Sequence, residues 1–101
     1  MELSSLVQDY YKSYDYRNLR DETKKQYEYF INVMLNTEVD GQALSTLDYT
    51  TMKTRVAKVA YNEWCEKGIH MANHIMSSAS IVFNHGLRME LCTLNPFANV
   101  R

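Results

Sequence analysis

Apolar residues recur at steps of three and four along most of this chain, and such spacing predicts amphipathic α-helices. The pattern is broken over one long stretch, residues 36–47, where Asp40 and Gly41 indicate a turn. The helices predicted on either side of this connection cover residues 3–14, 21–35, 49–67 and 70–89. The sequence therefore predicts an all-α fold of four helices.

Each predicted helix has one apolar face that we expect to be buried. In the fourth helix this face includes Ala72, Ala79 and Gly86, whose spacing of seven lets another backbone approach along a narrow seam. Glycine in a helix interior costs about 1 kcal/mol relative to alanine, so close packing is the expected reason for Gly86. The other residues expected on these faces are Leu3, Val7, Tyr10, Tyr11, Tyr14, Thr23, Tyr27, Phe30, Ile31, Met34, Met52, Val56, Val59, Ala60, Trp64, Ile75, Met76, Val82, Phe83 and Leu87.

Polar residues, glycine and proline mark where the helices should begin and end. Asp48 is expected to cap the third helix, because its carboxylate can accept a free backbone N–H two or three residues on. Gly68 fits the left-handed position just past the end of that helix. Asn95 precedes the only proline, Pro96, which predicts an extended or turn conformation and no further helix.

Length, composition and charge restrict the class of protein. The 101 residues suffice for one small domain with a single core, which we place at residues 1–101. Three glycines and one proline are too few for a β-rich fold with many tight turns. The formal charge of −1 gives no argument of its own for a polyanionic partner. Two unpaired cysteines, no apolar run of about 18 residues and no signal-peptide pattern predict a cytoplasmic protein outside the membrane.

The residues that could carry chemistry do not form a recognisable catalytic or metal site. The sequence contains no nucleophile elbow and no glycine-rich phosphate loop, so we expect no catalytic residue and no cofactor. Cys65, His70, His74 and Cys92 come near a zinc-ligand spacing, but no Cys-x2-Cys knuckle is present. Since Cys65 adjoins the apolar face at Trp64, we expect two buried or half-buried thiols and no metal.

One face of the fourth predicted helix carries short hydrogen-bonding side chains and no acid. An ordinary exposed face is filled with Glu and Lys, whereas Asn, Ser and Arg are the residues that contact base edges and phosphates. A solvated face without a ligand is the alternative interpretation. The row consists of Asn73, Ser77, Ser80, Asn84 and Arg88, flanked by His70, His74 and His85.

The start of the second predicted helix offers a second set of polar contacts. Backbone N–H groups in a first turn point outward and can hold a phosphate, and basic side chains lie beside them. Two acids in the same turn, Asp21 and Glu22, count against a phosphate and favour a simple solvated start. The candidate residues here are Arg20, Thr23, Lys24 and Lys25.

Three segments, taken in their order and spacing, resemble the N-terminal core-binding domain of phage-type integrases, the tyrosine recombinases. They are LRDETKKQYEYFINVML, LSTLDYTTMKTRVAKV and HMANHIMSSASIVFNHGLRMELCTLNPFANV. The resemblance covers residues 3–100 and departs from the family at three points. Met71 stands for the usual Thr, Gly86 stands for the usual Ala, and RMEL lacks the glycine that often ends this helix.

The resemblance implies a SAM-like, four-helix-bundle-like domain that binds double-stranded DNA at a recombination site, for integration or excision. Its second and fourth helices would contact the duplex, with the fourth helix in the major groove. The DNA-binding residues that follow from the resemblance and the polar rows together are Arg20, Thr23, Lys24, Lys25, His70, Asn73, His74, Ser77, Asn84 and Arg88.

In this family the Asn-Pro exit leads through a linker to a catalytic domain with Arg, His and Tyr residues. This chain stops where that linker would begin, so we expect an isolated, monomeric DNA-binding domain that is not an enzyme. Other recombinase protomers would be partners of the full-length protein, which would be nucleoid-associated. The alternative is a helical protein-interaction domain with no nucleic-acid role, which the charge of −1 and the tyrosine-rich first two helices favour.

Overall fold

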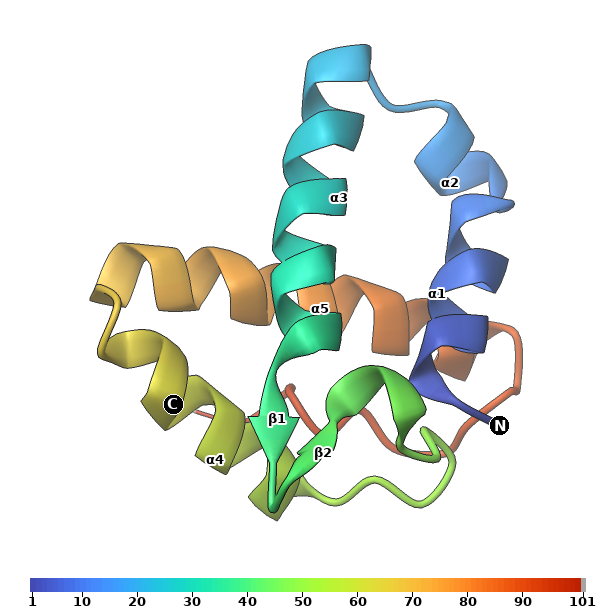
Figure 1. Ribbon diagram of the computed structural model, residues 1–101. Helices are drawn as coiled ribbons and strands as arrows, with labels where there is room; N and C mark the ends of the chain where they lie inside the picture. Colours follow the sequence, from blue (N-terminus) through green and yellow to red (C-terminus); the bar gives the residue numbers. More distant parts are fainter. Residues whose placement is uncertain (101) are drawn as a thin grey trace.

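The structure is a computed structural model and describes residues 1–100. Within these residues it contains five α-helices, one short 3₁₀ turn and one two-stranded antiparallel sheet (Figure 1). The mostly helical fold is thus confirmed, although the four predicted helices become five. The elements are α1 (Leu3–Tyr11), α2 (Tyr14–Arg17), α3 (Asp21–Asn36), β1 (Glu38–Val39), β2 (Gln42–Ala43), η1 (Leu44–Thr46), α4 (Thr54–Cys65) and α5 (Ile69–Arg88).

Helix α5 is the centre of the arrangement, since α1, α3 and α4 all pack against it. In Figure 1, α3 stands upright across α5, α1 stands beside α3, and α2 joins their upper ends. The β1–β2 hairpin and η1 lie at the opposite end of α3 from α2, with the hairpin close to α4 and η1 close to α1. The start of α3 and the whole of α2 therefore project to one side of α5.

The first predicted helix was wrong at its end, because the helix stops at Tyr11 and a separate short helix follows. Ser13 has an extended backbone, and its hydroxyl accepts the N–H of Tyr16 at 3.2 Å, which caps α2. A serine that bonds to its own backbone in this way competes with continuation of the preceding helix. Tyr14 is consequently 69% exposed instead of buried.

The third predicted helix began too early, since α4 starts at Thr54 and not at residue 49. The Asp48 carboxylate does accept the N–H of Thr50, at 2.9 Å, as the sequence predicted, but this bond closes a turn and not a helix cap. Residues Tyr49 and Met52 of this segment are buried in the core. Because both side chains pack into the core, this segment keeps an irregular, non-helical backbone.

The turn predicted at Asp40 and Gly41 is confirmed, but it closes a hairpin that the helical pattern did not indicate. Both residues have positive φ angles, 54° and 80°. This is the geometry of a two-residue hairpin loop, and it pairs Val39 with Gln42. The Asp40 carboxylate also lies 3.1 Å from the Arg55 guanidinium, in an exposed ion pair.

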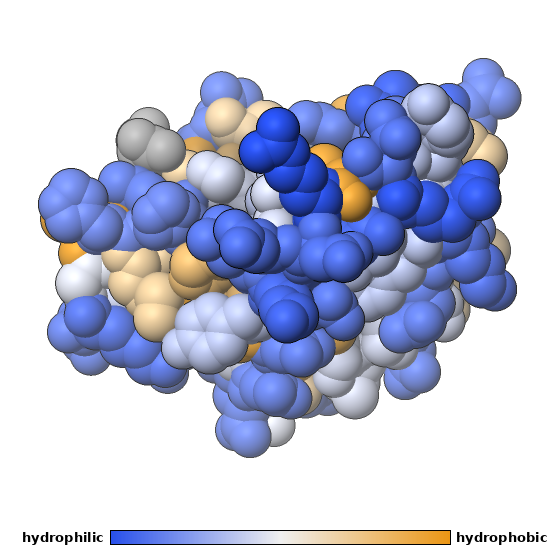
Figure 2. Space-filling view, turned by 90° about the horizontal axis from the view of Figure 1, so that it is seen from above, coloured by the Kyte–Doolittle hydropathy of each residue, from blue (hydrophilic) through white to orange (hydrophobic). Residues whose placement is uncertain are grey.

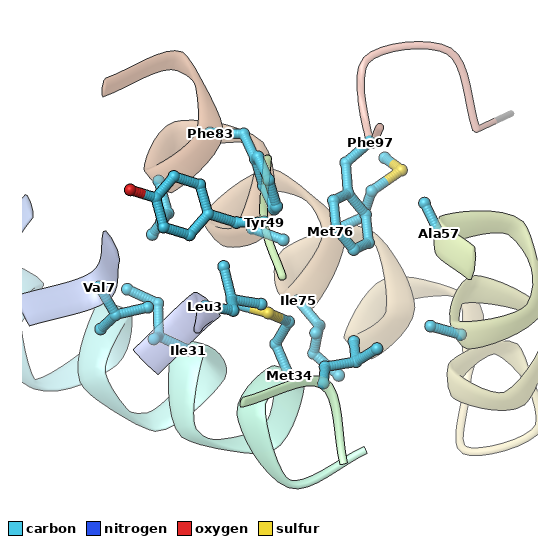
Figure 3. Packing of buried hydrophobic residues seen from close by; sticks show 14 of the residues in the cluster. Leu3, Val7, Ile31, Met34, Tyr49, Ala57, Ile75, Met76, Phe83 and Phe97 are labelled. Carbon is cyan, nitrogen blue, oxygen red and sulfur yellow. The ribbon is translucent and has the colours of Figure 1, made fainter. Parts of the chain in front are cut away.

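The hydrophobic core joins the first helix to the last residues of the chain. Trp64 and Phe83 are fully buried, as predicted. The ring of Phe97 stacks on Trp64 at a centroid distance of 5.9 Å and lies 5.7 Å from the ring of Phe83. Figure 3 shows Phe83 beside Tyr49 and above Leu3 of α1, whereas Phe97 lies next to Met76 of α5. The Trp64 indole donates to the Thr37 hydroxyl at 2.8 Å, so its polar atom is satisfied.

The predicted seam along α5 is confirmed, because Ala72, Ala79 and Gly86 are all buried. A Cβ atom at Gly86 would lie 2.8 Å from the Cys92 sulfur and 3.3 Å from a methyl carbon of Leu6. The missing side chain thus lets α1 and the segment after α5 approach the helix. Two other predictions of burial were wrong, since Val59 and Leu87 are exposed at the rims of their helices.

Helix α5 ends in a Schellman motif. The N–H of Leu91 donates to the carbonyl of Gly86 at 2.8 Å, and the N–H of Glu90 donates to the carbonyl of Leu87 at 3.1 Å. Glu90 has a φ of 58°, so a glutamate occupies the left-handed position where glycine is usual. Gly68, which follows α4, has a φ of 135° that favours glycine, but its ψ of 139° lies outside the left-handed helical region, so the predicted left-handed cap is not formed.

Both cysteines are free, Cys92 buried and Cys65 half-buried, as predicted. Burial raises the pKa of the Cys92 thiol. Among the helices of residues 1–100, none combines the length and the apolar composition needed to cross a lipid bilayer.

Candidate nucleic-acid interface

The exposed face of α5 forms one continuous stripe, which we call the α5 stripe. Its members are separated by three, four or seven residues, so they lie on one side of the helix. At 1.5 Å per residue the stripe is about 27 Å long, enough to follow a DNA groove over several base pairs. The side chains of the α5 stripe are His70, His74, Ser77, Asn84 and Arg88, all of them exposed.

Asn73 was predicted with this row, but the structure places it elsewhere. Its side chain is half-buried and turns toward α4, where its Oδ1 accepts the Tyr61 hydroxyl at 2.7 Å. Asn73 therefore joins α5 to α4, and its amide is already engaged.

His74 connects the α5 stripe to α3. Its imidazole stacks on the half-buried ring of Phe30, with centroids 5.2 Å apart and planes 10° apart. Because α3 crosses α5 (Figure 1), this contact places the middle of α3 directly beside the α5 stripe. The two helices predicted to contact a ligand thus form one joined surface.

The four candidate residues at the start of α3 divide into two pairs. Arg20 and Lys25 are exposed. Thr23 and Lys24 are half-buried, and the Lys24 ammonium lies 5.8 Å above the centre of the Tyr16 ring, in a cation–π contact. Figure 2 looks down on this end of the molecule and shows hydrophilic residues across the centre of the face. Arg20 and Lys25 are therefore the most accessible cations of this segment.

The α5 face lacks acids in the sequence, but the fold brings two of them to it. Asp15 of α2 lies 2.9 Å from the Arg88 guanidinium, in an exposed ion pair. Asp9 of α1 lies 2.7 Å from Nε2 of His85, whose side chain is buried. His85 is therefore a packing residue and not part of an exposed row. Arg88 remains on the surface with its charge partly compensated.

A cluster of tyrosines lies under the start of α3. The rings of Tyr10 and Tyr11 are 5.4 Å and 4.6 Å from that of Tyr16. Burial raises the pKa of Tyr10 to about 12, the acidic groups of Tyr27 and Asp15 add to the rise, and the Arg88 guanidinium opposes it. Burial, followed by a hydrogen bond with Glu28, raises the pKa of Tyr16 to about 12. These hydroxyls stay protonated near neutral pH and form an uncharged support for the cations above them.

The segment after α5 is tied to the α5 stripe by a hydrogen-bond network that the sequence reasoning missed. The buried amide of Asn95 donates from Nδ2 to the Ser80 hydroxyl and to Oδ1 of Asn84, both at 2.9 Å. Its Oδ1 accepts the N–H of Phe97, also at 2.9 Å. The sequence indicates only that Asn95 precedes a proline, although Asn commonly forms an Asx turn, in which its side chain bonds to the backbone two residues on. The network holds Asn84 and Ser80 in fixed orientations.

Metal-binding residues do not gather in the part of the chain that the structure describes. No three side chains of His, Cys, Asp or Glu within residues 1–100 come close enough to hold an ion. Cys65, His70, His74 and Cys92, which come near a zinc spacing in the sequence, therefore do not form such a group.

Comparison of the chain with protein-family models, with curated proteins and with solved structures found no match. The chemistry of the interface must be argued from its own side chains. The α5 stripe offers imidazole, hydroxyl, amide and guanidinium groups, every one of which can donate a hydrogen bond. Together with the cations at the start of α3, they suit a ligand rich in acceptors and negative charge.

Proposed function

We propose that this chain is the core-binding domain of a site-specific tyrosine recombinase and that it holds duplex DNA with α5 and the start of α3. The observation that carries the proposal is the α5 stripe, an exposed helix face without a Glu or Asp of its own. Such a face can approach a phosphate backbone without repulsion from its own side chains. The order of the three segments that resemble integrases supports the assignment to recombinases.

The two helices have different tasks in this proposal. An α-helix fits the major groove of B-DNA, where His74, Ser77 and Asn84 of the α5 stripe would face base edges. Arg20 and Lys25 would contact phosphates and set the position of the domain on the duplex. In the full-length protein, a catalytic domain and further protomers would complete the grip, so we expect this chain alone neither to cleave nor to join DNA.

The proposal predicts weak binding. The affinity of a protein for DNA rises with the number of phosphates it neutralises, and each contact adds to the salt dependence. This chain has a formal charge of −1, and Asp15 already compensates Arg88. The exposed acids Asp21 and Glu22 lie beside the cations of α3. We therefore expect binding that is measurable at low salt and fades toward physiological salt.

An NMR titration with duplex DNA tests the surface directly. The expected result is a set of shifted backbone amides confined to α5 and the start of α3, which weakens as salt is added. Shifts elsewhere, or no shifts at low salt with a genuine recombination site, would contradict the proposal. The residues expected to shift are Arg20, Thr23, Lys24, Lys25, His74, Ser77, Asn84 and Arg88.

Paired lysine variants separate specific contacts from overall charge. Replacing Lys24 and Lys25 with Gln should weaken binding to every duplex by a similar factor and reduce the salt dependence, because phosphate contacts do not read sequence. The matched control replaces Lys53 and Lys58, two exposed lysines at and within α4, and makes the same change of charge. Equal losses from both pairs would show that charge alone matters.

A helical protein-interaction domain remains the second candidate, and one observation favours it. Four exposed apolar side chains lie at the end of α5 and just beyond it, and exposed apolar clusters often mark protein contacts. DNA that left the α5 stripe unshifted in the titration would favour this function. The four residues are Leu87, Met89, Leu91 and Leu94.

A further inference from the structure

We infer that Asn84 presents its amide N–H groups, and not its oxygen, to DNA, and that Asn95 sets this orientation. The inference rests on the proposed function and names the chemistry that this position reads. The partner of Asn84 would be a hydrogen-bond acceptor, either a phosphate oxygen or the acceptor edge of guanine. Adenine, which Asn reads with its oxygen and nitrogen together, would not be its partner.

The first step is the orientation of Asn95, which two backbone groups determine. The N–H of Phe97 can only donate, so the amide atom 2.9 Å from it must be Oδ1 of Asn95. The carbonyl of Ser80 can only accept, so the amide atom 3.3 Å from it must be Nδ2. The two constraints agree, and Asn95 is buried. Its Nδ2 therefore points toward α5.

The orientation of Asn95 in turn determines the orientation of the Asn84 amide. The Asn84 side-chain atom that lies 2.9 Å from Nδ2 of Asn95 faces a donor, so it must be Oδ1. The amide nitrogen of Asn84 is then on the other branch of the side chain, on an exposed residue of the α5 stripe. An Asn on an ordinary exposed helix face can turn either end outward. Here a backbone N–H two residues beyond Asn95 decides which end is free.

The third step is what a free N–H₂ group can bind. Adenine offers an acceptor at N7 beside a donor at N6, and an Asn side chain matches both only when its oxygen is also available. Guanine offers two acceptors, N7 and O6, and a phosphate offers acceptors alone. Because its oxygen is turned toward the buried Asn95 and already accepts one hydrogen bond, Asn84 is better matched to the second kind of surface.

The orientation can be tested in the free protein, without DNA. Side-chain amide NMR signals of Asn95 should show contacts to Ser80 and Asn84 and should exchange slowly with water. The amide protons of Asn84 should exchange quickly, since they face solvent. Slow exchange of the Asn84 amide protons, with contacts to Asn95, would overturn the inference whatever the protein binds.

The second experiment measures the DNA affinity of Asn84→Ala and compares it with that of Asn62→Ala, a matched change at an exposed Asn of α4. We expect Asn84→Ala to weaken binding about three- to tenfold, as for loss of one hydrogen bond, and Asn62→Ala to have no effect. Equal losses on an all-A·T duplex and a G·C duplex would identify an acceptor common to both, as a phosphate oxygen is. A loss confined to the G·C duplex would identify guanine.

Two results would count against the inference or its premise, and they can be told apart. A loss confined to the A·T duplex would overturn the inference while leaving the proposed function intact. Absence of binding by the unsubstituted chain to either duplex at low salt would overturn the proposed function and the DNA part of the inference together. Circular dichroism melts of each variant establish that the domain is folded before binding is compared.

Discussion

Glu90 holds a backbone conformation that costs free energy for any residue with a Cβ atom. Its φ of 58° lies in the left-handed region, where contact between Cβ and the neighbouring backbone costs roughly 1–2 kcal/mol. The hydrogen bonds of Leu91 and Glu90 back to Gly86 and Leu87 hold it there. The missing glycine in RMEL, visible in the sequence, thus did not remove the helix end. The Schellman motif still forms, and Glu90 is strained as a result.

Replacing Glu90 with Gly should therefore stabilise the domain. We expect the free energy of unfolding to rise by about 0.5–1 kcal/mol, since relief of strain exceeds the added entropy of unfolded glycine. Urea unfolding measures the difference. Glu90→Ala is the control, because it removes the same charge and keeps the Cβ atom. A glycine variant no more stable than the alanine variant would show that the position is unstrained.

At the scale of elements, the packing of α5 depends on Gly86, where there is no room for a side chain larger than a hydrogen atom. Gly86 faces Leu6 of α1 on one side and Cys92 on the other. A helix normally gains about 1 kcal/mol when an interior glycine becomes alanine. The 2.8 Å approach to the Cys92 sulfur reverses this expectation, because a short buried side chain has little room to move.

Gly86→Ala should lower the free energy of unfolding by about 1–3 kcal/mol, as overpacking usually does. Adding Cys92→Ala should recover much of the loss, since it removes the atom that the new methyl group meets. Thermal or urea melts of the two single variants and the double variant give the coupling between the positions. Additive effects would mean that the sulfur is not the obstacle.

The same scale shows what the pattern of apolar residues can and cannot predict. Helices α3 and α5 were predicted almost to their ends, because their stripes are unbroken. The C-terminal end of the first predicted helix and the start of the third were wrong. Ser13 and Asp48 form local side-chain hydrogen bonds to the backbone there, and these close turns where helix was predicted. The hairpin was missed because each strand has two residues, too few for an alternating pattern, although the Asp40-Gly41 pair is a strong hairpin signal.

For the whole molecule, the sequence predicted many of the outward-facing residues of α5, but it misplaced Asn73, His85 and Leu87 and did not show what reaches α5 from elsewhere. The pairs Arg88–Asp15 and His85–Asp9 join residues 73 and 76 positions apart. Helical spacing carries no information about such contacts. They show, however, that His85 is directed toward α1 and that the charge of Arg88 is partly compensated. Helical spacing could thus predict much of the exposure along α5, while the contacts and compensated charges required the fold.

The tyrosine cluster, which joins α1, α2 and α3, predicts how the whole domain responds to alkaline pH. The pKa values of Tyr10 and Tyr16 are raised on folding to about 12, from a usual value near 10. A raised phenol pKa means that the stabilising contribution is complete below about pH 10 and is lost as pH rises toward 12. The melting temperature should therefore fall steeply across this range.

Tyr10→Phe should make this fall shallower, because one of the phenols no longer ionises. Tyr29→Phe is the control, since Tyr29 is exposed. Thermal melts at several pH values, together with phenolate absorbance, give both the stability and the ionisation. Identical alkaline behaviour of the two variants would show that ionisation of Tyr10 is not coupled to unfolding.

The stacking of Phe97 on Trp64 has a consequence for the order in which the domain can be made. Phe97 lies after all five helices in the chain, yet its ring and Pro96 are part of the core. During synthesis the helices leave the ribosome first, and until residue 97 follows them Trp64 lacks its stacking partner. Until then the newly made helices expose the apolar surface around Trp64 to solvent, and exposed apolar surface is what chaperones recognise. Completion of the fold is tied to release of the segment that follows α5.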